Sequence, residues 1–320
     1  MRNNIAIMDA FIMTAGGGLA SPIVLRPLTG RLTTLPLRWR IPLLKRQLEP
    51  TYRARMGLIE EQEESKKPDG PLDQLTRMLR FARDKRPHEY GDLDSIARRI
   101  AAANFGSTHQ ASIQVTHLLL DILGSDAEHN TIAVLRDEMN KVLYSDGNPT
   151  WTKAKVAKMV KADSAARETL RLHTFGGRSI MRKVVAPGGA KVDGHDGLVL
   201  PQGTYFSFLS RGAHVDGETY EDPLEYDPFR FSRIRERSNN ATLSFVTTSL
   251  DLAAFGHGKH ACPGRFIVDF EMKMFIAYIL LNYDVEFPSE YGGKRPENVW
   301  VTEAQFPPPG VRMRFRRKEN

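Results

Sequence analysis

The stretch FGHGKHACPG, residues 255–264, contains the only cysteine of the chain, Cys262. Glycine adopts backbone conformations that other residues resist, so Gly256 and Gly258 predict a tight loop. Pro263 is typical of the first turn of a helix, because its missing N–H would have no partner there anyway. We therefore expect Cys262 just before a helix, where free backbone N–H groups and the helix dipole favour negative charge.

A cysteine in such a place has three chemical uses. A thiolate is stabilised there and can bind a metal, including haem iron, to which it donates electron density that favours O–O cleavage. His257, His260 and Cys262 could instead be three ligands of zinc, although a fourth ligand is not evident nearby and the glycines would be unexplained. A nucleophilic Cys262 with His260 as its base is the third use, and two positions on one loop are awkwardly placed for it.

The loop resembles the haem-binding signature of the cytochrome P-450 family. That signature is Phe, two residues, Gly, three residues, Cys, one residue and Gly, and each fixed position is filled here. His260 stands where the family has an arginine or histidine that holds a haem propionate. The resemblance implies haem as the cofactor, with Cys262 as the axial ligand of its iron. It places the cofactor contacts of the loop at Phe255, Gly256, Gly258, His260, Cys262 and Gly264.

Glu168 and Arg171 form a second motif, Glu-x-x-Arg. Taken alone, such a pair on a helix is an ordinary surface ion pair worth about 0.2–0.5 kcal/mol. Its place before the cysteine loop resembles the family's invariant Glu-x-x-Arg, and Arg230 resembles the third member of the family's structural triad. A bidentate network of the three would pin the irregular segment at residues 221–231. These residues would be structural and would take no part in the chemistry.

Two arginines compete for a second haem contact. Arg182 resembles the arginine that meets a haem propionate after the Glu-x-x-Arg helix. Arg178 is a competing candidate for the same contact. The alternative for either residue is an arginine at a strand edge that faces only solvent.

A long helix is predicted over residues 93–123, with Asp92 or Asp94 as its cap. Its middle, residues 101–109, is crowded with small side chains. Such a composition allows either tight packing against another helix or the close approach of a ligand. The resemblance makes this the helix that crosses the distal face of the haem.

The candidate catalytic residues on this helix depart from the family pattern. Most members carry an acid and a threonine that deliver protons to bound dioxygen, and alignment puts His109 and Gln110 at these positions. Ser112 or an ordered water could replace the threonine, and His109 could shuttle protons. A plain packed histidine is the alternative for His109.

Helices are expected to dominate, with a small β portion after the middle of the chain. The first sixty residues look helical, with breaks at Pro22, Pro27, Pro36 and Pro42. A charged loop is predicted at residues 60–71. Further helices are predicted at residues 72–81, 131–143, 153–172 and 264–281. Short strands are predicted at residues 180–185, 198–200, 204–209, 283–287 and 311–315.

The resemblance covers nearly the whole chain and implies a cytochrome P-450 fold that lacks its N-terminal part. Residues 1–320 would form one partial domain. Residues 1–175 would be the mainly helical distal part with the Glu-x-x-Arg helix. Residues 176–320 would hold the β segments, the haem loop, the final helix and the last strands.

A family motif that grips the propionates, Trp-x-x-x-Arg, is not found. Trp39, Trp151 and Trp300 are followed four residues later by Leu, Lys and Ala. We therefore expect a chain that lacks the family's membrane anchor and first strands. No transmembrane or signal segment is expected either, because the apolar residues 5–20 are too few to span a bilayer and lack the layout of a signal peptide.

Composition limits the partners. The net charge of +7 suits an anionic partner such as a membrane surface or an acidic redox protein. Nucleic acid is not expected, because no basic patch is interleaved with aromatic residues. With one cysteine, the chain has no internal disulfide and no site built from several cysteines.

The resemblance implies a monooxygenase. It would oxidise a lipophilic small molecule, such as a fungal secondary metabolite, with O2 and with electrons passed from NADPH by a separate NADPH-cytochrome reductase. A full-length relative would lie at the cytoplasmic face of the endoplasmic reticulum membrane. The alternative is a truncated remnant without functional haem binding.

Overall fold

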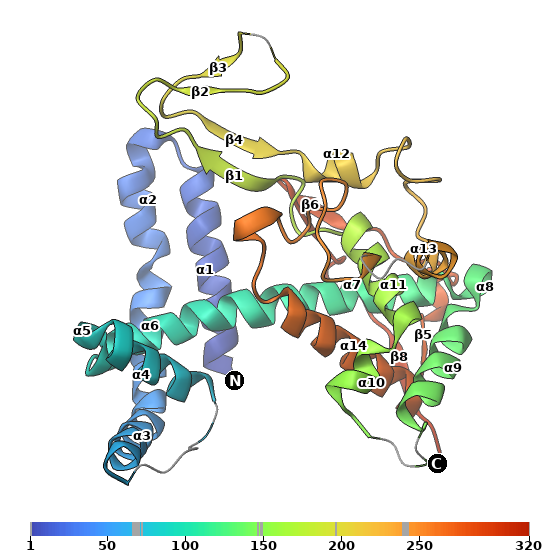
Figure 1. Ribbon diagram of the computed structural model, residues 1–320, viewed down its shortest axis with the longest axis horizontal. Coiled ribbons are helices and arrows are strands. Elements are labelled where there is room, and N and C mark those ends of the chain that lie inside the picture. The colour runs from blue at the N-terminus through green and yellow to red at the C-terminus, as the bar shows by residue number, and fades with distance from the viewer. Residues whose placement is uncertain are drawn as a thin grey trace. The chain divides into compact units, whose positions relative to one another are not determined.

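The computed structural model describes residues 2–65, 71, 73–145, 147, 150–195, 197–238 and 243–319. The chain divides into two compact units, Met1–Gln110 and Ala111–Asn320. Helices form most of the first unit and the larger elements of the second, and every strand that the structure describes lies in the second unit (Figure 1). This confirms the prediction of a mainly helical chain with a small β portion.

The first unit is a cluster of helices. The long helices pack through two buried apolar clusters, one centred on Ile7, Ile41 and Ala101 and the other on Ile59, Leu79 and Ile96. The elements are α1 (Arg2–Ala20), η1 (Ile23–Leu25), α2 (Arg26–Thr33), α3 (Leu35–Ser65), α4 (Gln74–Lys85), α5 (Pro87–Tyr90), α6 (Leu93–Asn104) and η2 (Phe105–His109).

Two expectations for this unit are wrong. The break predicted at Pro42 does not occur. The helix α3 continues through both Pro42 and Pro50. A proline inside a helix costs about 3 kcal/mol, and the burial of Ile41 against α1 and α6 helps to offset that cost. The charged loop predicted at residues 60–71 is helical as far as Ser65, since Glu and Gln are good helix formers. Its residues 66–70 lie outside the described part of the chain.

The predicted long helix is interrupted at its small-residue stretch. Asp92 caps α6 by accepting a hydrogen bond from the backbone N–H of Asp94 over 2.9 Å. The segment η2 is a π-helical turn over Phe105–His109, and helix resumes as α7 (Gln110–Gly124). Such π-turns occur often at functional sites. Helical periodicity alone cannot predict them, because they add only one residue to a turn.

The second unit surrounds one large apolar core. Leu118 of α7, Leu135 of α9 (Thr131–Leu143), Ala165 of α11 (Val160–Leu172) and Ile276 of α14 (Arg265–Asn282) are fully buried in it. The smaller helices of this unit are α8 (Asp126–His129), α10 (Lys153–Ala157), α12 (Ser210–His214), α13 (Arg230–Ser238), η4 (Gly258–His260) and η5 (Ser289–Tyr291).

The strands form four antiparallel pairs. They are β1 (Ser179–Lys183) with β4 (Tyr205–Phe208), β2 (Ala190–Lys191) with β3 (Val199–Leu200), β5 (Tyr283–Glu286) with β8 (Arg314–Arg317), and β6 (Val299–Val301) with β7 (Ala304–Phe306). The predicted strands match β1, β3, β4 and β5. The last strand begins at Arg314 and not at residue 311, where Val311 still closes a turn onto Pro308. The strands β2, β6 and β7 were not predicted. Among the described helices, none has the length and apolar character needed to cross a membrane.

Candidate cofactor site

The cysteine loop, residues 255–264, lies in the second unit, contains η4 and leads directly into α14. The backbone N–H of Cys262 donates to the carbonyl of Phe255 over 2.8 Å, which closes the loop. Gly256 and Gly258 have φ angles of +69° and +70°. These values lie in the left-handed region, so the structure explains why glycine occupies both positions.

Cys262 presents a free, half-buried thiol at the start of α14. Gly264 is the N-cap of that helix, and the first backbone N–H groups of a helix have no partner within it. Negative charge on the sulfur is therefore favoured. A Cβ at position 264 would lie 3.8 Å from Sγ, in ordinary van der Waals contact with the sulfur. The exposed residues 258–260 leave the loop accessible from solvent. These features fit a thiolate that binds haem iron.

Replacing Gly258 with alanine is expected to lower the free energy of unfolding of the haem-free protein by about 1–2 kcal/mol. A residue with a Cβ pays that cost in the left-handed region. Gly264→Ala is the matched control, because Gly264 has a φ of −75° and a Cβ there would make only van der Waals contact. Urea denaturation of both variants measures the difference. If the two variants lose the same free energy of unfolding, the positive φ of Gly258 is not the reason for glycine at that position.

The two alternative uses of Cys262 gain no support from the geometry. Among the residues described, no three His, Cys, Asp or Glu side chains gather as a metal-binding group. His257 instead bonds through Nδ1 to the hydroxyl of Thr248 over 3.0 Å. His260 is exposed, and no hydrogen bond connects it to Cys262 in the described part of the chain. Neither a zinc site nor a cysteine–histidine pair is formed.

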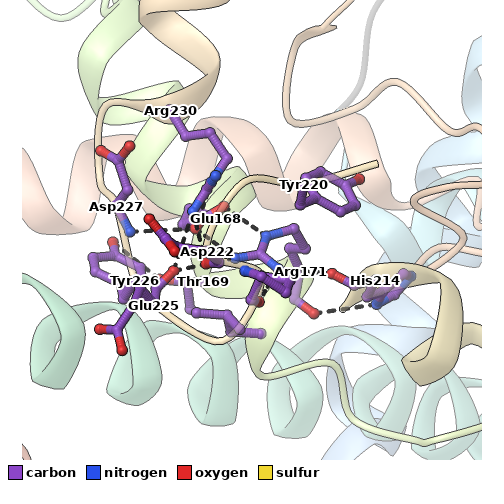
Figure 2. Close-up of polar contacts among 12 residues, drawn as sticks. Glu168, Thr169, Arg171, His214, Tyr220, Asp222, Glu225, Tyr226, Asp227 and Arg230 are labelled. Atoms are coloured by element: carbon purple, nitrogen blue, oxygen red, sulfur yellow. Dashed lines mark hydrogen bonds and ion pairs between the residues drawn. The ribbon is translucent and has the colours of Figure 1, made fainter. Parts of the chain in front are cut away.

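Glu168, Arg171 and Arg230 come together in the second unit (Figure 2). Arg171 donates from Nε and Nη2 to the two carboxylate oxygens of Glu168, over 2.8 and 2.7 Å. Arg230 donates from Nε to Oε1 of the same carboxylate over 3.1 Å. Both Glu168 and Arg171 have 0% exposed side chains. The carboxylate is thus held by two guanidinium groups away from water.

The two arginines also bind the irregular segment that precedes α13. Nη1 of Arg171 donates to the carbonyls of His214 and Pro223, over 2.7 and 2.6 Å. Arg230 donates from Nη1 to the carbonyl of Glu221 over 2.5 Å. The guanidinium of Arg171 also lies over the ring of Tyr220, 4.8 Å from its centre. Loop carbonyls that would otherwise need water are therefore satisfied by the buried Arg171 and the half-buried Arg230.

His214 links this network to the cysteine loop, and the sequence analysis missed it. Its Nδ1 lies 3.2 Å from the carbonyl of Arg171, and its Nε2 lies 3.0 Å from the backbone nitrogen of Ala253. Because Nε2 must accept from that N–H, the proton is assigned to Nδ1. The partners are 43 and 39 residues away in the sequence, so no local pattern marks this histidine. Ala253 in turn accepts from the N–H of Gly256 over 2.8 Å.

His214 should make stability depend on pH. Burial lowers its pKa from 6.5 to about 4, and the nearby Arg211 and Arg171 add to the effect. The folded state therefore favours neutral His214, and stability is lost as pH falls below 6.5 towards 4. At pH 4 the loss is on the order of 3 kcal/mol, since a tenfold change in a protonation constant is worth about 1.4 kcal/mol.

The measurement is urea unfolding of wild type and His214→Gln at pH 7 and pH 4. Other acid-sensitive groups, such as His117, are common to both proteins and cancel in the comparison. We expect the stability of the wild type to fall more than that of the variant. If the unfolding free energies of wild type and His214→Gln fall equally between pH 7 and pH 4, His214 is not a buried neutral histidine in the folded state.

A second buried polar cluster was also missed. Burial alone would raise the pKa of Asp121, but His173, Arg295 and the hydroxyl of Thr169 lower it to about 2. Nε2 of His173 lies 3.0 Å from the carboxylate, and the rings of His173 and His117 stack with centres 5.0 Å apart. The cluster ties α7 to the residues just after the Glu-x-x-Arg helix. Asp121, His173 and Arg295 are far apart in the sequence, so no local sequence pattern predicts that they form a cluster.

The two candidate arginines near β1 differ in their partners. Arg178 forms an ion pair with Glu303. Arg182 is exposed and donates to the carbonyl of Met181 over 2.8 Å. It forms no ion pair with any residue that the structure describes. The geometry therefore favours Arg182 over Arg178 as a group free to meet a propionate.

The candidate catalytic residues are divided between the units. His109 and Gln110 end the first unit, while Ser112 and the cysteine loop belong to the second. His109 is half-buried and stacks on Phe105, with ring centres 6.0 Å apart. Gln110 and Ser112 are exposed. A role for these residues in oxygen chemistry stays a prediction.

Comparison with known proteins gives the family. The model of the cytochrome P-450 family matches residues 44–314. Cytochrome P-450 monooxygenase pbrC of Penicillium brasilianum is 49% identical over 98% of this chain and 59% of its own length. Cytochrome P-450 monooxygenase astC of Aspergillus terreus has the same identity and coverage. Cytochrome P-450 monooxygenase tenB of Beauveria bassiana is 41% identical over 98% of this chain. The chain spans about three fifths of the length of these curated relatives.

Proposed function

Because this chain belongs to the cytochrome P-450 family, we propose that it serves as a haem-dependent monooxygenase acting on a lipophilic small molecule. The single observation that carries the proposal is the free, half-buried thiol of Cys262 directly before α14, in a loop closed by the bond from its own N–H to the carbonyl of Phe255. The names of the fungal relatives, all monooxygenases, support the reaction class. A fungal secondary metabolite is the substrate class we propose.

Different residues would bind the haem iron, bind the haem propionates and support the surrounding fold. Cys262 would be the axial ligand of the haem iron, and His260 and Arg182 would meet its propionates. Bound haem supplies dioxygen activation, for which a thiolate ligand is suited. Glu168, Arg171 and Arg230 would keep the segment before α13 in place and would not touch the substrate.

Proton delivery belongs to the distal helix in this proposal. His109 would hold or pass a proton through its ring nitrogens, which can donate and accept hydrogen bonds. Gln110 stands where most of the family has threonine, and its amide can hydrogen-bond but cannot ionise. Ser112 or an ordered water would complete the path. The half-buried position of His109 supports this assignment.

The electrons would come from NADPH through an NADPH-cytochrome reductase. We propose the cytoplasmic face of the endoplasmic reticulum membrane as the place where the longer relatives meet that partner. The net charge of this chain, +7, supports association with an acidic redox protein or an anionic surface.

Reductase-dependent oxidation of a lipophilic probe tests the function. The chain is produced with an NADPH-cytochrome reductase and supplied with an aryl alkyl ether. One O2 and one NADPH with a proton would convert the ether to a phenol, an aldehyde and water. We expect phenol formation that requires NADPH and the reductase and is lost in Cys262→Ser. Phenol formation unchanged in Cys262→Ser, or failure of the chain to take up haem, would contradict the proposal. The second outcome would identify a non-catalytic member of the family.

A further inference from the structure

Arg265 begins α14, three residues after Cys262. Its Nη1 donates to the backbone carbonyl of Cys262 over 2.7 Å, and its Nε donates to the carbonyl of Val246 over 3.0 Å. The guanidinium also lies 4.3 Å from the centre of the Phe266 ring. It forms no ion pair with any described residue. Arg265 is thus a cation fixed to the backbone of the proposed iron ligand without an anion beside it.

The second anchor of Arg265, the carbonyl of Val246, belongs to a segment that α11 holds. Arg167 donates from Nη1 to the carbonyls of Ser244 and Thr247. Asp163 accepts from the backbone N–H of Phe245 over 2.9 Å. Both α11 side chains are almost fully buried. The position of the Val246 carbonyl, and with it that of the Arg265 guanidinium, is therefore set by a buried helix.

The same segment also touches the start of the cysteine loop. The ring of Phe245 meets that of Phe255 edge to face, with centres 5.3 Å apart. Phe255 in turn accepts the hydrogen bond from the N–H of Cys262. The residues 244–247 therefore fix the cysteine from two sides, through Phe255 and through Arg265.

We propose that Arg265 is a positioning residue that orients Cys262 and sets the reduction potential of the haem iron this cysteine would bind. The proposal rests on the proposed function. A fixed positive charge near a thiolate stabilises its negative charge, and that effect is strong where water is partly excluded. Reduction adds an electron to the iron site, so a nearby cation favours the reduced form and raises the potential.

The test is the reduction potential of the haem-loaded chain, measured by spectroelectrochemical titration. Arg265→Gln removes the charge and should shift the potential to more negative values. It should also enlarge the fraction of the reduced, carbon-monoxide complex that has lost its thiolate. Arg265→Lys keeps the charge but cannot donate as a fork to both carbonyls, so a smaller negative shift is expected.

Arg136→Gln is the control. Arg136 lies on α9, contacts the C-terminal end of α14 and, unlike Arg265, also forms an ion pair with Asp284. Arg136 also donates to two backbone carbonyls, those of Leu280 and Tyr283, over 2.8 and 2.9 Å. Its replacement should lower stability without moving the potential. An equal shift in Arg136→Gln, or an Arg265→Gln protein with the potential and spectrum of the wild type, would overturn the proposal.

Two further outcomes are decisive. If Arg265→Gln does not fold, Arg265→Met, which also removes the charge but keeps a long apolar side chain, carries the test, and an unchanged potential and spectrum in that variant overturns the inference. If the wild type itself takes up no haem, the proposed function fails and this inference falls with it. A loaded wild type with unshifted Arg265 variants overturns the inference alone, so the two failures are distinguishable.

Discussion

Replacing Arg171 with leucine should lower the free energy of unfolding by about 3–5 kcal/mol, because the change leaves a buried carboxylate without its main partner. Glu168 would lose its bidentate contact and keep two longer bonds, from Nε of Arg230 over 3.1 Å and from the backbone N–H of Asp227 over 3.3 Å. The carbonyls of His214 and Pro223 would lose their donor as well. The irregular segment before α13 should therefore loosen together with the helix.

Lys141→Leu provides the control for this prediction. Lys141 bonds to Asp137 one turn away on α9, with side chains 73% and 56% exposed. An exposed pair of that kind contributes about 0.2–0.5 kcal/mol. Urea denaturation of both variants should give losses that differ several-fold. A small loss in Arg171→Leu, comparable to that of the control, would show that the buried triad does not hold this part of the fold.

Replacing Cys262 with serine should weaken haem binding more than about tenfold, since losing only about 1.4 kcal/mol of the iron–thiolate bond suffices for that. Serine is nearly isosteric, and the thiol is only half-buried, so the unfolding free energy should change by less than about 1 kcal/mol. Quenching of tryptophan fluorescence by added haemin measures the affinity.

His260→Gln separates the iron contact from the propionate contact. Glutamine keeps a hydrogen-bond donor but loses the chance of positive charge. We expect weaker haem binding with the thiolate ligand retained. Equal affinity of wild type and Cys262→Ser would refute the assignment of the ligand, whatever His260→Gln does.

The cysteine loop could be predicted because its residues act within ten positions of one another. The glycines have the left-handed φ angles that glycine favours, and the helix begins directly after Gly264. Glu168 and Arg171 are also local, being one turn apart on α11. Their burial was not visible from the spacing, since the same spacing is usual on helix surfaces. Only the family resemblance distinguished the two situations.

The contacts that connect the parts of the site could not be predicted. His214 and Asp121 have partners far away in the sequence, and their side chains look like ordinary polar residues. The helix through Pro42 shows the same limit, because packing of Ile41 outweighs a local preference. The turn η2 adds one residue to a helix and leaves the composition unchanged. In each case the conformation or the contact depends on tertiary packing, which a local sequence pattern does not report.

We propose Cys262 as the axial ligand of a haem. The reduced, carbon-monoxide difference spectrum of the purified, haem-supplied chain tests this assignment most directly. We expect a Soret band at the position typical of thiolate ligation, and we expect this band to be absent in Cys262→Ser. A band typical of a lost thiolate, a spectrum unchanged in Cys262→Ser, or no haem band at all would contradict the assignment.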